Sequence, residues 1–325
     1  MNRLLVPTLA LLFLAGCRPQ AGSSGPGAGG TSAGPGKGAE RPPTLGEARK
    51  GFVTKIVRRG GEKEPVEEPP PRVFRKVTYD AAPGKLAAYL TPDPKDGKKH
   101  PAIVWITGGD CNSIGDVWSE APAKNDQTAS AYRKAGIVMM FPALRGGNDN
   151  PGTKEGFLGE VDDVLAAADF LAKQPYVDPA RIYLGGHSTG GTLVLLVAES
   201  SDKFRAVFSF GPVSDVGGYG PEYCPFDLRN PKEVELRSPG KWLHGIRSPT
   251  FVFEGAAGRS NVDELRAMAR ISTNAKVRFY PVRGADHFRL LAPVNRLVAS
   301  KILTDDGPTT NLSFTEDELN QAVGK

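Results

Sequence analysis

Short apolar runs alternate with helix-length amphipathic segments along most of this chain. The runs are rich in Val, Ile and Phe and are bounded by Gly, Asn, Asp or Pro, which is typical of strands buried on both faces. They lie at 102–107, 137–141, 182–184, 206–210, 250–253 and 277–280. Strands that alternate with helices predict a mostly parallel sheet with right-handed crossovers, so a ligand is expected beyond the carboxyl ends of the strands.

Two further strands, at 73–79 and 86–90, are separated by an Ala-Pro-Gly turn, and we expect them to pair antiparallel. Helices are expected at 129–135 and 159–173. In the second of these, apolar residues recur every three or four positions, which places them on one face. The pattern as a whole predicts an α/β domain with helices on both faces of a central sheet.

One junction between a strand and a helix carries a chemical motif. The sequence Gly186-His187-Ser188-Thr189-Gly190 is a G-x-S-x-G nucleophile elbow, with the strand before it and the helix after it. Such a turn holds serine in a strained backbone conformation that lifts its hydroxyl off the sheet edge. The amides that begin the helix point at the place where an anionic intermediate would form. Ser188 is therefore the candidate nucleophile, and the elbow histidine is expected to pack rather than to catalyse.

From about Val73 to Leu303 the chain resembles the α/β-hydrolase fold, and within it the catalytic domain of the prolyl oligopeptidase family. Besides the elbow, the resemblance is carried by the segments 142–147 (PALRGG), 162–164 (DDV) and 176–182 (YVDPARI). It implies a serine peptidase that forms an acyl-enzyme. Family members also carry a long β-propeller, for which the stretch before this domain is too short. Simple esters and amides therefore stay open as substrates beside peptides.

A serine hydroxyl needs a base within hydrogen-bond reach before it becomes a good nucleophile. His287, in Gly-Ala-Asp-His-Phe, follows the last expected strand and precedes the C-terminal helix. The resemblance implies the base at this place, and the chain order serine, acid, histidine is the one expected.

The acid is where the sequence departs from the family pattern, because Gly258 occupies the place of the usual aspartate. Three carboxylates remain open. Glu254 ends an apolar strand, where an unpaired buried charge would be costly, so His287 is its natural partner. Asp263 opens a helix and is explained equally by capping it. Asp215 follows the preceding strand, which some hydrolases use. Glu254 is the first expectation of the three.

Stabilising the oxyanion requires donors that are already in place. One is expected to be the backbone amide of Thr189, which follows the nucleophile. The other is expected from the loop that contains Gly109 and Asp110, which resembles the His-Gly-Gly loop of esterases with Thr107 in place of histidine.

The cysteines leave two possibilities for Cys111 and Cys224, which are expected near the same sheet edge. Outside the cytoplasm an isolated pair often oxidises, so a disulfide between them and two separately packed thiols are both open.

The first residues indicate an exported lipoprotein. Arg3 precedes an apolar run that is too short for a membrane span and long enough for a signal peptide, and the run ends in Leu-Ala-Gly-Cys17, which resembles a lipobox. We expect acylation of Cys17 and anchoring to a bacterial membrane, the outer one if the cell has two, because Arg18 rather than aspartate follows. The expected domains are a signal peptide (1–16), the lipidated cysteine and a Gly/Pro/Ser-rich linker (17–72), an α/β-hydrolase domain (73–303) and a tail with a short helix (304–325).

Composition narrows the remaining classes. At 325 residues, 39% hydrophobic and 24% charged, the chain suffices for one sizeable core. Its net charge of +5 comes from scattered basic residues, so no nucleic-acid partner is expected. No Cys/His spacing suits zinc and no phosphate loop occurs, so neither a metal nor a cofactor is expected. The open alternatives are a carboxylesterase and a decayed hydrolase that acts as an envelope binding module. The oligomeric state stays undetermined.

Overall fold

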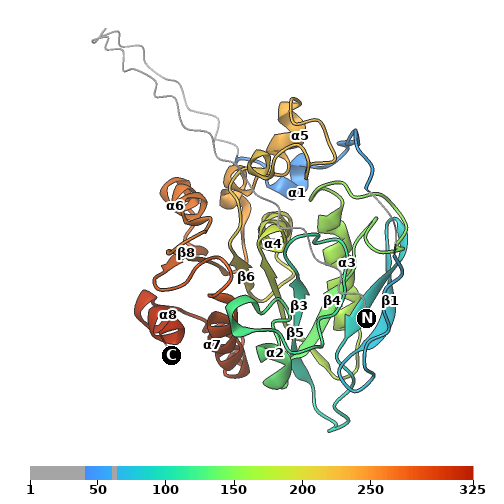
Figure 1. Ribbon diagram of the computed structural model, residues 1–325, viewed down its shortest axis with the longest axis vertical. Helices are drawn as coiled ribbons and strands as arrows, with labels where there is room; N and C mark the ends of the chain where they lie inside the picture. The colour runs from blue at the N-terminus through green and yellow to red at the C-terminus, as the bar shows by residue number, and fades with distance from the viewer. Residues whose placement is uncertain (1–40, 61–63, 325) are drawn as a thin grey trace, which may run out of the picture. The chain divides into compact units, whose positions relative to one another are not determined.

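A mostly parallel sheet organises the residues that the computed structural model describes, 41–60 and 64–324. Its strand order is β1-β2-β4-β3-β5-β6-β7-β8, in which β1 and β2 are antiparallel and the strands from β3 to β8 run parallel (Figure 1). The strands are β1 (Arg75–Ala81), β2 (Gly84–Leu90), β3 (His100–Ile106), β4 (Val138–Pro142), β5 (Val177–His187), β6 (Val207–Phe210), β7 (Thr250–Gly255) and β8 (Val277–Val282). The sheet predicted from the apolar runs is confirmed.

Helices cover both faces of this sheet, as Figure 1 shows. One apolar cluster joins the sheet to α3, α4 and α6, and the other joins it to α2, α7 and α8. The helices are α1 (Leu45–Ala48), α2 (Ala131–Lys134), α3 (Glu160–Ala172), α4 (Thr189–Ser200), α5 (Pro231–Glu235), α6 (Val262–Ile271), α7 (Leu291–Leu303) and α8 (Glu316–Val323). Short 3-10 turns occur at η1 (Ala123–Asn125), η2 (Val216–Tyr219), η3 (Pro239–Lys241) and η4 (Leu243–Gly245).

The central strand β3 explains why the apolar runs are continuous. Val104 and Ile106 belong to the first cluster, whereas Ile103 and Trp105 belong to the second. Successive side chains of a strand point to opposite faces, and both faces here are covered by helices. Every position of β3 from Pro101 to Ile106 is therefore apolar and buried.

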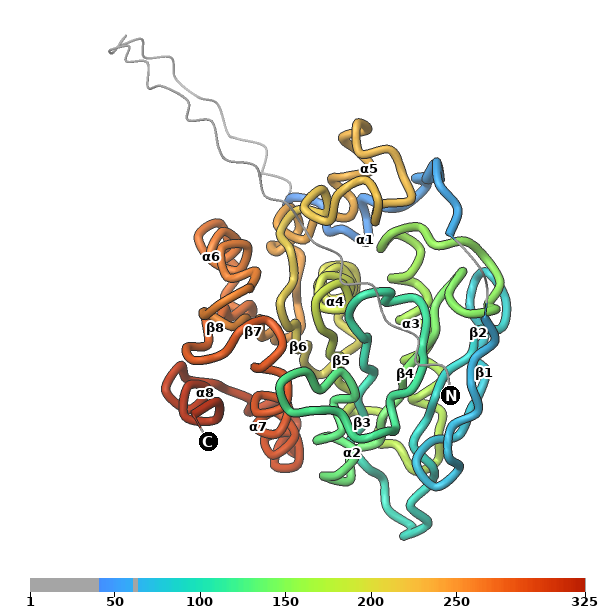
Figure 2. The backbone as a smooth tube through the Cα atoms, viewed as in Figure 1, coloured from blue at the N-terminus to red at the C-terminus, as the bar shows by residue number. Residues whose placement is uncertain are grey.

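The segment before β1 packs onto the domain instead of forming a linker throughout. The compact unit begins at Pro42, earlier than the start expected near Val73. Thr44 caps the N-terminus of α1 with a capping box. Farther along the segment, Ile56 forms a β-bridge with Phe226, and the amide of Val57 donates to the carbonyl of Pro225 at 2.8 Å. Figure 2 traces this segment along the 221–237 connection. We call residues 42–60 the N-terminal strap.

The C-terminal residues also belong to the domain core. The predicted short helix is α8, and Thr315 caps its N-terminus with a capping box. Leu319 of this helix is fully buried in the second apolar cluster. Just after α7, Asp305 forms an ion pair with Arg205 at 2.7 Å. The expected tail with its short helix therefore packs on the second face of the sheet.

The structure decides between the two alternatives that were open for Cys111 and Cys224. Both are free and buried. The Cys111 sulfur lies 3.8 Å from the hydroxyl of Tyr223, whereas the Cys224 sulfur lies 3.7 Å from the carbonyl of Val216. Burial raises the pKa of Cys111 to about 12 and that of Cys224 to about 11. Of the two open alternatives, the bridge is wrong because the side chains turn to different partners, and the structure has the two packed thiols.

The signal-peptide residues and Cys17 lie outside the described residues. Among the residues that are described, every helix is too short or too polar to span a bilayer. Within the same residues, no group of three or more His, Cys, Asp or Glu side chains is arranged to hold a metal ion.

Candidate active site

Ser188 lies at the sharp turn between β5 and α4. Its backbone has φ 57° and ψ −116°, a conformation that costs an L-residue roughly 1–3 kcal/mol and that persists only where the surroundings impose it. Its amide donates to the carbonyl of Phe210 at 2.7 Å, which ties the turn to β6. A Cβ on Gly186 would lie 2.6 Å from the carbonyl oxygen of Gly190, so the turn requires glycine there. The local sequence thus presents the serine hydroxyl at the carboxyl edge of the sheet.

His287 and Glu254 form a buried pair at the same edge. The Nδ1 atom of His287 lies 3.0 Å from one carboxylate oxygen of Glu254 and 3.3 Å from the other. Glu254 is fully buried near the end of β7, and His287 is 8% exposed in the loop after β8. Gly211 makes room for the pair, because a Cβ there would lie 2.6 Å from Nδ1 of His287. No described residue hydrogen-bonds to Nε2 of His287, so that nitrogen is open for proton transfer.

The other two candidate acids lie elsewhere. The Asp263 side chain is 93% exposed and pairs with Arg266 at 3.2 Å. It sits inside the first turn of α6, whose cap residue is Asn261, so the expected capping role for Asp263 is wrong. Asp215 caps η2 by accepting the amide of Gly217 at 2.8 Å. Of the three carboxylates, the structure brings Glu254 alone to His287.

Two backbone amides are available beside the nucleophile. The amides of Thr189 and Gly109 have no hydrogen-bond partner within the described parts of the chain. Two hydrogen bonds hold the loop that carries Gly109. The carbonyl oxygen of Gly109 accepts from the Thr189 hydroxyl at 2.9 Å and from the Tyr223 hydroxyl at 3.2 Å. Asp110 accepts from the ammonium of Lys154 at 2.7 Å. Sequence reasoning missed Tyr223, since no motif surrounds it.

A cavity of about 700 Å³ begins at this loop and extends to the N-terminal strap. Gly108 and Asp110 line it on the side of the oxyanion loop, and Arg59 lines it from the strap. Lys154 and Glu64 add one charge of each sign. The lining is therefore polar and mixed in charge, and no pattern in the sequence indicated that residues 59 and 64 would line a cavity beside the oxyanion loop.

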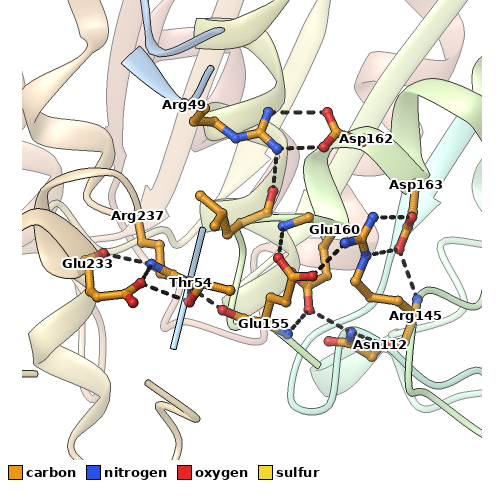
Figure 3. A network of polar contacts seen from close by, with 12 residues as sticks. Arg49, Thr54, Asn112, Arg145, Glu155, Glu160, Asp162, Asp163, Glu233 and Arg237 are labelled. Atoms are coloured by element: carbon orange, nitrogen blue, oxygen red, sulfur yellow. Dashed lines mark hydrogen bonds and ion pairs between the residues drawn. The ribbon is translucent and has the colours of Figure 1, made fainter. Parts of the chain in front are cut away.

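A buried ion-pair network joins the loop after β4 to the start of α3. Figure 3 shows the guanidinium of Arg145 between Asp163 and Glu155, at 2.8 and 2.6 Å. Burial opposes its charge, yet the two carboxylates raise the pKa of Arg145 above its usual value. Asn112 links this pair to the oxyanion loop, because its amide donates to the carbonyl of Arg145 at 2.8 Å and to Glu160 at 3.0 Å.

The N-terminal strap joins the same network. Arg49 donates to Asp162 of α3 at 2.7 Å, and the hydroxyl of Thr54 donates to Glu233 of α5 at 2.9 Å (Figure 3). The buried Arg237 donates to the same Glu233 carboxylate at 2.6 Å. These contacts hold the strap against α3 and α5.

Comparison with known proteins bears on these observations. Residues 124–233 match the model of the prolyl oligopeptidase family. Dipeptidyl-peptidase 5 of Porphyromonas gingivalis is 33% identical over 128 residues, 37% of this chain and 18% of that protein. A Bacillus subtilis protein named uncharacterized peptidase YtmA is 28% identical over 181 residues, 51% of this chain and 66% of that protein. The chain thus spans less than two thirds of the length of these relatives.

A solved structure of an acylaminoacyl peptidase in complex with Z-Gly-Gly-Phe-chloromethyl ketone superposes with a TM-score of 0.60 at 17% identity. The superposition covers 76% of this chain and 43% of that one. The predicted α/β-hydrolase fold and the resemblance to the prolyl oligopeptidase family are confirmed, and the matches support a hydrolase of the serine peptidase type. The family match contains Ser188 but neither Glu254 nor His287, so the base and the acid rest on geometry.

Proposed function

We propose that this protein is a serine hydrolase that cleaves peptide or amide bonds through an acyl-enzyme. The observation that carries the proposal is the 3.0 Å contact between His287 and the buried Glu254, at the edge where Ser188 is held in a strained elbow. Ser188 is the nucleophile, His287 the base and Glu254 the acid. The histidine's partner supports an active site over a decayed one, because burying a carboxylate against it is costly without a use.

The geometry supports the following steps. The Ser188 hydroxyl attacks the substrate carbonyl while its proton passes to Nε2 of His287, and Glu254 stabilises the resulting imidazolium through Nδ1. The oxyanion accepts from the amides of Thr189 and Gly109. His287 then gives its proton to the leaving amine as the carbon–nitrogen bond breaks. Water attacks the acyl-serine by the same proton route and regenerates the free hydroxyl.

The polar cavity supports a short peptide or aminoacyl amide as substrate. Its polar lining, which carries charges of both signs, suits a substrate with ionic groups. We propose that aminoacyl and peptidyl substrates are turned over with a higher kcat/KM than uncharged acyl substrates that carry the same leaving group, a comparison that removes the higher intrinsic reactivity of esters. A higher kcat/KM for the uncharged acyl substrates would assign the protein to the carboxylesterases instead.

The reaction class is tested with a fluorophosphonate probe, which labels an activated serine. The parent should be labelled, Ser188→Ala should not be, and Ser300→Ala, on the exposed side of α7, should be labelled like the parent. Labelling that persists in Ser188→Ala would place the nucleophile elsewhere. A folded parent that is not labelled at all would favour the decayed hydrolase that acts as an envelope binding module.

We also propose that the protein is anchored outside the cytoplasm by lipid on Cys17, on the strength of the lipobox in the sequence. Cys17→Ser should accumulate as an unprocessed precursor without lipid. Cleavage and membrane association of that variant like the parent would contradict the anchor.

A further inference from the structure

His187, the second residue of the elbow motif, is bonded at both ring nitrogens. Its Nε2 lies 3.0 Å from the backbone carbonyl oxygen of His287. Its Nδ1 lies 3.0 Å from the side-chain nitrogen of Gln127, in the loop before α2. The ring is 1% exposed, and its centroid lies 4.5 Å from that of the His287 ring. His187 therefore touches both the loop of the catalytic base and a loop that has no place in the steps above.

The donors and acceptors around this ring fit a single arrangement. The carbonyl of His287 can only accept, so Nε2 of His187 carries the proton and donates. Nδ1 then accepts from Gln127, whose second amide proton goes to Asn125 at 2.8 Å. The oxygen of Gln127 accepts from the amide of Gly108 at 3.4 Å. The Gln127 oxygen also lies 3.2 Å from Nδ1, but donation to it would require an imidazolium. Burial, together with the charge of nearby His287, lowers the pKa of His187 well below its usual value, which excludes that form.

The result is a continuous chain of hydrogen bonds from the oxyanion loop to the acid. It runs from Gly108 through Gln127 and His187 to the backbone of His287, whose ring continues to Glu254. The oxyanion loop follows β3, and the base lies in the loop after β8, with three strands between β3 and β8 in the sheet. Strand pairing does not join those two loops to each other, and the bonds through Gln127 and His187 form a direct link between them.

We propose that Gln127 and His187 are positioning residues that hold the oxyanion loop and the catalytic histidine at a fixed separation. The inference rests on the proposed function, since it concerns the separation between the base and the oxyanion donors of that reaction. Neither residue exchanges a proton with substrate. Misplacing a catalytic group by about 1 Å costs on the order of 100-fold in rate, so the loss should appear in kcat and leave substrate binding intact.

The experiment compares Gln127→Leu, His187→Phe and the double variant in amide hydrolysis and in the rate of fluorophosphonate labelling. Each single variant should lower kcat by about 10- to 100-fold with KM nearly unchanged. Because both residues belong to one chain of hydrogen bonds, the double variant should lose no more activity than the worse single variant.

A rescue variant and a control complete the set. His187→Gln should recover most of the loss in His187→Phe, since its amide can still donate to the carbonyl of His287. The matched control is His244→Phe, which removes an exposed histidine bonded to the carbonyl of Pro43 at 3.0 Å and should keep parental kcat.

Outcomes separate this inference from the proposed function. Folded Gln127→Leu and His187→Phe with parental kcat, or losses that multiply in the double variant, would overturn the positioning role while Ser188-dependent labelling keeps the hydrolase. Gln127 is half-buried, so its variant remains informative if His187→Phe does not fold. If the parent has no activity, nitrogen NMR of the imidazoles decides. Gln127→Leu should then shift the ring signals of both His187 and His287, and unchanged signals would overturn the inference.

Discussion

Two fully buried carboxylates of this domain have partners of different chemistry. Asp163 faces the guanidinium of Arg145, and Glu254 faces the imidazole of His287. Each carboxylate is fully buried, and its burial is offset by a nitrogen partner, at 2.8 Å for Asp163 and 3.0 Å for Glu254. A guanidinium stays charged at every working pH, whereas an imidazole can take up and release a proton.

The contacts around the two carboxylates differ in the same direction. Asp163 accepts from the backbone amide of Arg145 and from two of its guanidinium nitrogens, and Glu155 holds a third (Figure 3). Glu254 meets a single nitrogen of His287, and the second nitrogen of that ring is left open within the described residues. The comparison teaches that a saturated ion pair with a permanent charge holds loops in place, while a pair that leaves one ring nitrogen unbonded has an atom available for proton transfer.

Breaking the pair of Glu254 and His287 should have the largest effect. In Glu254→Gln the amide cannot stabilise an imidazolium, and its nitrogen favours the wrong tautomer of His287. A comparable change in a serine protease lowers kcat on the order of 10⁴-fold, and we expect that size here with KM and the melting temperature little changed. Kinetics beside circular dichroism melting measure this. A fully active variant would remove Glu254 from the mechanism.

Breaking the permanent pair should act on stability instead. Asp163→Asn leaves the buried guanidinium of Arg145 with Glu155 as its remaining ionic partner. Removing one member of a buried pair costs about 3–5 kcal/mol of unfolding free energy. Urea denaturation gives this value, and kcat per folded molecule should stay within about tenfold of the parent. An unchanged denaturation midpoint would show that the pair does not hold the loops.

The ion pair of Arg205 and Asp305 provides a pH-dependent test of how much a permanent ion pair stabilises the fold. Burial alone would raise the pKa of Asp305, but bonds from Arg205, Tyr183 and Thr310 lower it to about 2. The carboxylate therefore stabilises the folded state above pH 4, and this stabilisation is lost as the pH falls from about 4 to 2. It amounts to up to about 2 kcal/mol. Asp305→Asn should be less stable than the parent at pH 5, and the difference should shrink toward pH 2. A difference that does not change with pH would contradict the assignment.

The sequence was informative where structure is local or periodic. The elbow around Ser188 is contained in five residues, and the strand β3 follows from its continuous apolar run. Glu254 was expected at the site because a carboxylate at the end of a buried strand needs a partner. The resemblance to a known fold supplied His287, which no local pattern around it would have identified.

The sequence was silent where contacts join segments that are distant in the chain. Tyr223 and Gln127 reach the oxyanion loop through single hydrogen bonds that leave no periodic signal. The N-terminal strap packs by polar and backbone contacts, and the Pro/Glu-rich residues after it suggested a linker throughout. The disulfide prediction relied on a shared sheet edge, and proximity does not fix the direction of a side chain.

The smallest expected effect belongs to an exposed carboxylate, Asp263, which serves as the control for both buried ones. It lies in the first turn of α6 and pairs with Arg266 three residues on, so Asp263→Asn loses a favourable charge at a helix N-terminus and one surface ion pair. Such losses amount to about 0.3–1 kcal/mol and shrink with salt. We expect kcat and KM equal to the parent in the same assay that measures Glu254→Gln.

If Asp263→Asn were inactive while Glu254→Gln stayed active, the acid would be Asp263, and α6 would have to move its first turn toward His287 during the reaction. If both variants kept the activity of the parent, a Ser188–His287 dyad would remain. The burial of Glu254 would then serve the fold, as that of Asp163 does.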